Sequence, residues 1–130
     1  MDENVMIDSS FFICRFRERQ DPLAEIALAD PHYDFFSCGV VMAEVCGGMA
    51  TAKLRKAVRA KFAVMCWVPT TDKIWDRVAD IAFQLARKDI QMKTPDLVIA
   101  ASALEAQSSV LTFDSDYKFV PGLRVISSLN

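Results

Sequence analysis

Four acidic residues occupy positions where they could do chemistry rather than simply face water. Asp8 directly follows the apolar run Val5-Met6-Ile7, and Asp114 lies two residues after the apolar run that ends at Thr112. Both runs are typical of buried strands, and parallel sheets bind their ligands beyond the carboxyl ends of the strands. Each aspartate could instead be an ordinary turn residue whose side chain bonds nearby amides.

Glu44 and Asp96 fall on predicted helices. Glu44 lies beside Val41 and Val45, on the stripe of its helix that should face the protein. A buried carboxylate needs a partner, either an arginine or lysine that reaches in or a metal ion. Asp96 lies in the first turn of its helix, where the helix dipole alone favours a negative charge. The same turn would face Asp8 if this helix packs against the sheet.

If these four carboxylates converge, with or without Asp116, their repulsion would force some of them to bind protons unless cations compensate. Oxygen ligands without histidine or cysteine favour Mg²⁺ or Mn²⁺, with several waters left for a substrate phosphate to replace. We hypothesise one or two ions, the first held chiefly by Asp8, Asp96 and Asp114. This ion would activate a water and the second would take the leaving oxygen, while Glu44 bridges or supports the pair.

Other catalytic machinery is missing from the sequence. Cleavage through the RNA 2′-hydroxyl commonly uses two histidines, and the chain has only His32, in a predicted surface loop. There is no Walker A loop, no GxGxxG and no GxSxG motif. The four cysteines, Cys14, Cys38, Cys46 and Cys66, form no CxxC pair. We therefore expect no zinc site and no disulfide framework, and we expect these cysteines to be buried as small apolar residues.

Composition sets the limits of the fold. The 130 residues are 52% hydrophobic and 25% charged, which fits one domain, residues 1–130, with a core of its own. No apolar run is long enough to cross a bilayer and no leader opens the chain, so we expect a soluble, cytoplasmic protein. A net charge of −2 argues against binding nucleic acid by a general basic surface. It does not argue against a nuclease that holds cations with carboxylates.

The elements that must position the acids alternate between short apolar runs and helical patterns. Strands are predicted at 5–7, 35–37, 67–69, 110–112 and 124–126, and helices after Ser9 or Ser10, around 23–29, from about 40 to the Gly47-Gly48 pair, at about 51–65, after Thr71-Asp72, and from Thr94 to about Leu104. Ser9 or Ser10 and Thr94 are the expected N-caps. This order predicts an α/β fold with a mostly parallel sheet and helices on both faces.

One predicted helix has a basic face. Lys53, Arg55, Lys56 and Arg59 lie mostly opposite the apolar stripe of the helix at about 51–65. Such a face is either merely solvated or a contact for substrate phosphates.

The whole chain resembles the PIN domain family, and within it the small VapC-type toxins. Four blocks in order carry the resemblance. They are Val5-Met6-Ile7-Asp8-Ser9-Ser10, the segment from Ser37 to Glu44-Val45, the segment Asp96-Leu97-Val98-Ile99-Ala100-Ala101-Ser102-Ala103, and Leu111-Thr112-Phe113-Asp114-Ser115-Asp116-Tyr117 followed by Pro121-Gly122-Leu123-Arg124-Val125.

The resemblance implies a three-layer α/β/α sandwich and a Mg²⁺- or Mn²⁺-dependent endoribonuclease that leaves 5′-phosphate and 3′-hydroxyl ends. It also implies an antitoxin partner and a homodimer. The family's acidic quartet corresponds to Asp8, Glu44, Asp96 and Asp114, and an additional acidic position to Asp116. Hydroxyl positions that orient the metal ligands correspond to Ser10 and Thr112.

The sequence departs from the family at two turns. Arg87-Lys88-Asp89-Ile90 lacks a glycine often found there, and Gln107-Ser108-Ser109 replaces another. Three alternatives to the toxin remain open: an RNA-processing PIN nuclease, a non-catalytic PIN-like module that binds RNA or protein, and a metal-dependent hydrolase of small phosphoesters.

Overall fold

Five parallel strands form a single sheet at the centre of the computed structural model, which describes residues 3–29 and 31–129. The strands are β1 (Glu3–Ile7), β2 (Tyr33–Ser37), β3 (Cys66–Trp67), β4 (Ser109–Leu111) and β5 (Val125–Ile126), in the spatial order β3-β2-β1-β4-β5. Every neighbouring pair is parallel. The predicted α/β class and parallel sheet are confirmed.

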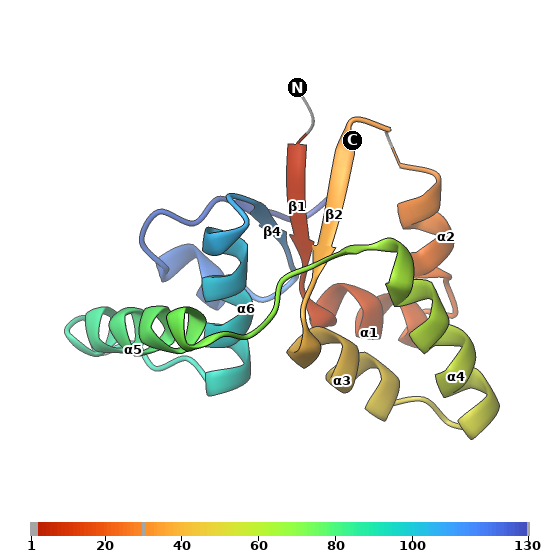
Figure 1. Ribbon diagram of the computed structural model, residues 1–130, viewed down its shortest axis with the longest axis horizontal. Helices are drawn as coiled ribbons and strands as arrows, with labels where there is room; N and C mark the ends of the chain where they lie inside the picture. The colour runs from red at the N-terminus through yellow and green to blue at the C-terminus, as the bar shows by residue number, and fades with distance from the viewer. Residues whose placement is uncertain (1–2, 30, 130) are drawn as a thin grey trace.

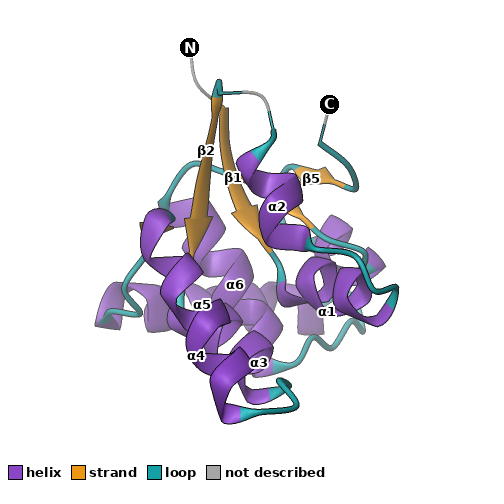
Figure 2. Cartoon of the chain, turned by 90° about the vertical axis from the view of Figure 1, so that its right-hand side faces the viewer, coloured by secondary structure: helices purple, strands orange, loops and turns teal. Residues whose placement is uncertain are grey.

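Helices flank the sheet (Figure 1). They are α1 (Ser9–Arg17), α2 (Pro22–Ala27), α3 (Gly39–Gly47), α4 (Ala52–Lys61), α5 (Asp72–Ala86) and α6 (Thr94–Glu105), with short 3₁₀ helices η1 (Phe62–Val64) and η2 (Ser115–Phe119). In Figure 1, α5 and α6 lie to the left of the strands and α1 to α4 to the right. Figure 2 shows β1 and β2 side by side, both pointing toward the helices below.

The centre of the sheet is apolar because its middle strands are covered on both faces. Val5, Met6 and Ile7 of β1 have no exposed surface, and neither do Val110 and Leu111 of β4. The helix α6 is buried almost all round, as its apolar sequence predicts. Burial of this kind supplies most of the free energy that holds the fold together.

The strand order places a site at one position in the sheet. The chain starts with β1 in the middle, builds outward through β2 and β3, and then returns to add β4 and β5 on the other side of β1. Ligands of open parallel sheets bind where the order reverses, outside the carboxyl ends of the strands. Here that point lies between the ends of β1 and β4. Asp8 follows β1 there, and Thr112 follows β4.

Helix starts differ from expectation in two places. Neither Ser9 nor Ser10 caps α1, because Asp8 occupies the N-cap position without a side-chain capping bond. Both serine hydroxyls instead bond carboxylates, as described below. Thr94 is the first residue of α6, and Lys93 is its N-cap.

Two of the cysteines do not match the prediction of burial. Cys38 and Cys46 are buried, but Cys14 is only partly buried and Cys66 is exposed. All four are free thiols. His32 is exposed in a turn, as predicted. Over residues 3–29 and 31–129, the longest apolar helices fall short of what crossing a membrane requires.

The two turns that lack the expected glycine keep a glycine-like backbone. Asp89 has φ +57° and Gln107 has φ +52°. Gln107 ends α6 in a Schellman arrangement, in which the Ser108 N–H donates to the Ala103 carbonyl at 2.9 Å. A left-handed conformation costs a residue with a Cβ about 1–2 kcal/mol. Without glycine, these turns therefore follow the same backbone path but are more strained.

We expect Gln107→Gly to stabilise the protein by about 0.5–1 kcal/mol, since relief of the left-handed strain exceeds the added entropy of the unfolded chain. Urea denaturation followed by circular dichroism measures the change. The control is Ala106→Gly at the neighbouring position, where φ is −80°. That change should be destabilising, because position 106 has no left-handed strain for glycine to relieve. A Gln107→Gly variant less stable than wild type would contradict this account.

Candidate active site

Three hydroxyl groups surround the buried carboxylate of Asp8, which is 2% exposed. Ser10 Oγ donates to Oδ2 at 2.7 Å, and Thr112 Oγ1 donates to the same oxygen at 2.8 Å. The Tyr117 hydroxyl donates to Oδ1 at 2.9 Å. These three hydrogen bonds fix the orientation of a carboxylate from which water is largely excluded.

The same hydroxyls fix the loop that carries Asp114. The Phe113 N–H donates to Ser10 Oγ at 3.1 Å, and the Asp114 N–H donates to Thr112 Oγ1 at 2.9 Å. Ser10 and Thr112 thus tie the end of β1 to the end of β4 and hold the backbone of Asp114 beside Asp8. They lie where the resemblance places the metal-orienting hydroxyls.

Asp96 at the start of α6 lies among the other three acids. The pKa of its carboxyl is raised to about 6, chiefly by burial and then by the charges of Asp8, Asp114 and Glu44, while the hydrogen bond from the Tyr117 hydroxyl opposes the shift. Charges act on each other in this way only over short distances. The structure therefore links Asp8 and Asp96 through the Tyr117 hydroxyl and places Asp114 and Glu44 near enough to act on Asp96 by their charge.

Glu44 is exposed, so the expectation that it faces the protein interior is wrong. It accepts a hydrogen bond from Ser9 Oγ at 2.9 Å. No salt bridge from a described arginine or lysine reaches it, so the cationic partner considered from the sequence is not seen among residues 3–29 and 31–129. Helix α3 is short and packs through Val41 and Val45, which leaves the Glu44 carboxylate at the solvent edge of the acidic cluster.

Tyr117 is the residue of this site that sequence reasoning missed. Its side chain is completely buried, and its hydroxyl lies 2.9 Å from Asp8 Oδ1 and 3.4 Å from Asp96 Oδ1. Burial and the neighbouring carboxylates raise the pKa of this phenol far above its usual value, so it remains a proton donor. The sequence offers one sign of this role, since Tyr117 is a tyrosine that lies only three residues after Asp114.

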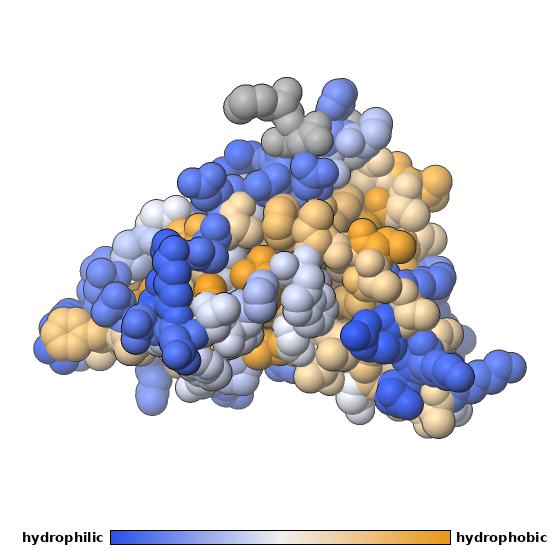
Figure 3. All heavy atoms as spheres, viewed as in Figure 1, coloured by the Kyte–Doolittle hydropathy of each residue, from blue (hydrophilic) through white to orange (hydrophobic). Residues whose placement is uncertain are grey.

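The remaining candidates lie around the rim. Asp116 is exposed, and its N–H donates to Asp114 Oδ1 at 2.9 Å, which forms the turn that opens η2. Lys53, Arg55, Lys56 and Arg59 are all exposed on α4. This helix packs against α3, which carries Glu44. Figure 3 shows hydrophilic side chains gathered at the lower right, where α4 lies in Figure 1.

The four acids are chemically suited to bind a divalent cation, although their carboxylates are spaced more widely than the ligands of a bound ion. The acids offer oxygen atoms only, and a cation would offset the charges of Asp8, Asp114 and Glu44, which add to burial in raising the pKa of Asp96. Within the described ranges no three histidine, cysteine, aspartate or glutamate side chains already have the spacing to hold an ion. The hydroxyl of Tyr117 lies between two of the acids instead.

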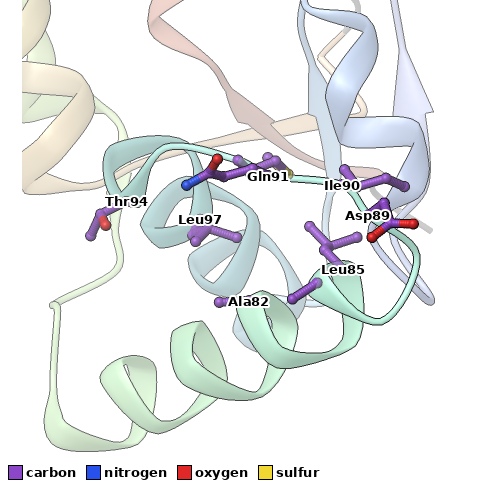
Figure 4. Close-up of a pocket in the computed structure, with 9 residues that line it drawn as sticks. Ala82, Leu85, Asp89, Ile90, Gln91, Thr94 and Leu97 are labelled. Atoms are coloured by element: carbon purple, nitrogen blue, oxygen red, sulfur yellow. The ribbon is translucent and has the colours of Figure 1, made fainter.

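The surface also has hollows lined mainly by other residues, and one of them borders Glu44. A hollow of about 490 Å³ lies between α5 and the segment that leads into α6 (Figure 4). Leu85 and Leu97 are among its lining residues, and Asp89 is its one carboxylate. A second hollow of about 340 Å³ is lined by Phe16 of α1 and by Glu44, so it opens beside the acidic cluster.

The chain belongs to the PIN domain family, since the family model described as "PIN domain" matches residues 5–123. PIN domains are typically nucleases that use divalent metals. No curated protein matches the sequence.

Solved structures with the same fold come from VapBC toxin–antitoxin systems. VapBC2 from Rickettsia felis, bound to a promoter DNA fragment, matches with TM-score 0.79 and 15% identity over 95% of this chain and 97% of that chain. VapBC-5 from Mycobacterium tuberculosis matches with TM-score 0.67 and 25% identity, over 96% and 98%. VapC20 from the same organism, described as a sarcin-ricin loop cleaving toxin, gives TM-score 0.69 and 14% identity, over 97% and 99%. The structural neighbours are therefore VapC toxins, and the predicted resemblance is confirmed.

The raised pKa of Asp96 makes a prediction about stability in the absence of metal. The folded protein holds this proton up to about pH 6, whereas an unfolded chain releases it near pH 4. Between these values the folded state binds more protons, so stability falls as pH rises, and the full penalty is present above pH 6. Asp96→Asn removes this penalty. The stability of Asp96→Asn relative to wild type should therefore be about 1–2 kcal/mol greater at pH 7.5 than at pH 4.

Urea denaturation in EDTA at the two pH values measures this difference. Asp76→Asn, an exposed position on α5, serves as the matched control and should show no such trend. If the difference in stability between Asp96→Asn and wild type is the same at pH 4 and at pH 7.5, the pKa of Asp96 is not raised in the folded protein.

Proposed function

We propose that this PIN domain is a Mg²⁺- or Mn²⁺-dependent endoribonuclease and the toxin of a VapBC-type pair. One observation carries the proposal. Where the strand order of the sheet reverses, the Tyr117 hydroxyl reaches carboxylate oxygens of both Asp8 and Asp96, and burial together with the charges of Asp8, Asp114 and Glu44 raises the pKa of Asp96. A fold gains no stability from crowding like charges, and a cation-dependent reaction gives the cluster a use.

Asp8, Asp96 and Asp114 would hold the ion, with Glu44 supporting it from the exposed side and Asp116 as a further ligand. A divalent ion supplies charge that favours attack of water on phosphorus and stabilises the leaving oxygen. Ser10 and Thr112 fix the orientation of the Asp8 carboxylate through their bonds to Oδ2. Support of this kind for a ligand is worth about 10–100-fold in metal affinity or activity.

The rim of the site suits a polymeric substrate. Glu44 and Asp116 are exposed, and Asp96 and Asp114 are only partly buried, so a phosphodiester can approach without entering a closed cavity. The exposed cations of α4 would bind neighbouring phosphates, since none of them forms a salt bridge with a described carboxylate. This openness favours RNA over a small phosphoester.

The toxin role rests on the structural neighbours, which are described as members of VapBC systems and, in one case, as a toxin that cleaves the sarcin-ricin loop. We propose an antitoxin protein as partner and a homodimer as the active form, in the cytoplasm. A small gene directly upstream that encodes a DNA-binding protein would support the toxin over an RNA-processing PIN nuclease.

Purified protein should cleave structured RNA in Mg²⁺ or Mn²⁺ and stop in EDTA. Asp8→Asn removes the charge at the centre of the cluster, so we expect it to lower the cleavage rate by at least about 100-fold. Gel analysis of end-labelled RNA measures the rate and shows whether the ends are 5′-phosphate and 3′-hydroxyl.

Asp76→Asn is the control and should cleave at the wild-type rate. Cleavage that survives both EDTA and Asp8→Asn would rule out the metal mechanism. If the wild type neither binds Mn²⁺ nor cleaves RNA or nucleotides, the non-catalytic module is the better description.

The basic face of α4 is tested by RNA affinity. Lys56→Ala should weaken binding to all RNA sequences similarly and reduce the slope of log K against log salt by about 0.7, the value for one phosphate contact on a single strand. Filter binding in Ca²⁺ or EDTA, at several salt concentrations, measures both. Lys88→Ala, an exposed lysine beyond the end of α5, is the matched control. Equal slopes for the two variants would show that α4 is only a solvated face.

A further inference from the structure

Tyr117 connects the two acids that face each other across the site. It comes from η2, after β4, while Asp8 follows β1 and Asp96 lies in the first turn of α6. No part of the Tyr117 side chain is exposed. The core around it therefore holds its hydroxyl in one place, where it reaches Oδ1 of both aspartates.

A phenol has one proton to donate, and here two carboxylate oxygens accept it. The bond to Asp8 Oδ1 is 2.9 Å long and the approach to Asp96 Oδ1 is 3.4 Å, so Asp8 takes the larger share. Ser10 and Thr112 both donate to Oδ2 of Asp8 and leave Oδ1 to Tyr117. The tyrosine hydroxyl is thus a hydrogen-bond donor shared between the carboxylates of Asp8 and Asp96.

We propose that Tyr117 is a positioning residue that takes the place of the cation between Asp8 and Asp96 in the metal-free protein and competes with it for Asp8 Oδ1. The inference rests on the proposed function. In the metal-free state the hydroxyl holds the two carboxylates near each other. When a cation binds, the hydroxyl must give up part of its bond to Oδ1, and this loss weakens cation binding. Tyr117 therefore lowers metal affinity while it stabilises the empty site.

The test is titration calorimetry with Mn²⁺ on the full chain, wild type against Tyr117→Phe. Phenylalanine keeps the buried ring and removes only the competing hydroxyl. We expect the variant to bind Mn²⁺ about tenfold more tightly, equivalent to about 1.4 kcal/mol, and to melt at a lower temperature than wild type in EDTA. Tyr33→Phe removes the chain's other tyrosine hydroxyl, at the start of β2, and should leave Mn²⁺ affinity unchanged.

A second measurement uses the wild-type protein and does not depend on the variant folding. With ¹³C-labelled tyrosine, the ring-carbon resonance of Tyr117 next to the hydroxyl should shift as Mg²⁺ is added and saturate with the ion, while that of Tyr33 stays still. Unchanged or weaker Mn²⁺ binding by a folded Tyr117→Phe variant would overturn the proposal. So would a Tyr117 resonance that does not move while the ion binds.

These outcomes are separate from those that test the proposed function. A wild-type enzyme that cleaves RNA in Mg²⁺, with equal Mn²⁺ affinities for wild type and Tyr117→Phe, retains the nuclease and loses the role of Tyr117. Wild type and Tyr117→Phe that both fail to bind Mn²⁺ would refute both.

Discussion

Repulsion between carboxylates is the interaction on which the rest of this structure depends. Asp8 and Asp96 are brought together with a single phenol proton between them, and Asp114 and Glu44 add further negative charge. Burial and these charges together raise the pKa of Asp96, so an ionised Asp96 carries a cost in stability that the apolar core of the sheet and of α6 must offset. The protein thus maintains, at a cost in stability, a site that a doubly charged ion would stabilise.

Topology places the cluster, and hydroxyl groups give it its shape. Because the strand order reverses between β1 and β4, the residues that follow these strands meet at one edge of the sheet. Ser10 and Thr112 join the two strand ends and bond one oxygen of Asp8, while Tyr117 bonds the other. Each acid is held by a different element, so β1, α3, α6 and the segment after β4 must all be in place before the acids meet.

The sequence predicted the sheet, and the position of Asp8 directly after its first strand, better than the surroundings of the acids. Short apolar runs and helical periodicity identify strands and helices because burial follows the same repeat, and Asp8 is placed by the strand before it. Glu44 was misplaced, because a helical stripe does not show how much of its length the neighbours cover. Tyr117 was missed, since a bond to residues about 110 and 20 positions away leaves no local pattern. Gln107 adopts a glycine-like backbone that composition could not indicate.

The most direct test of the account is to collect anomalous diffraction from crystals of the protein grown or soaked in Mn²⁺. The account predicts an anomalous peak in contact with the carboxylates of Asp8 and Asp96, with the Tyr117 hydroxyl displaced from Oδ1 of Asp8. Crystals saturated with Mn²⁺ that show no peak at this edge of the sheet, or peaks only at other surfaces, would contradict it.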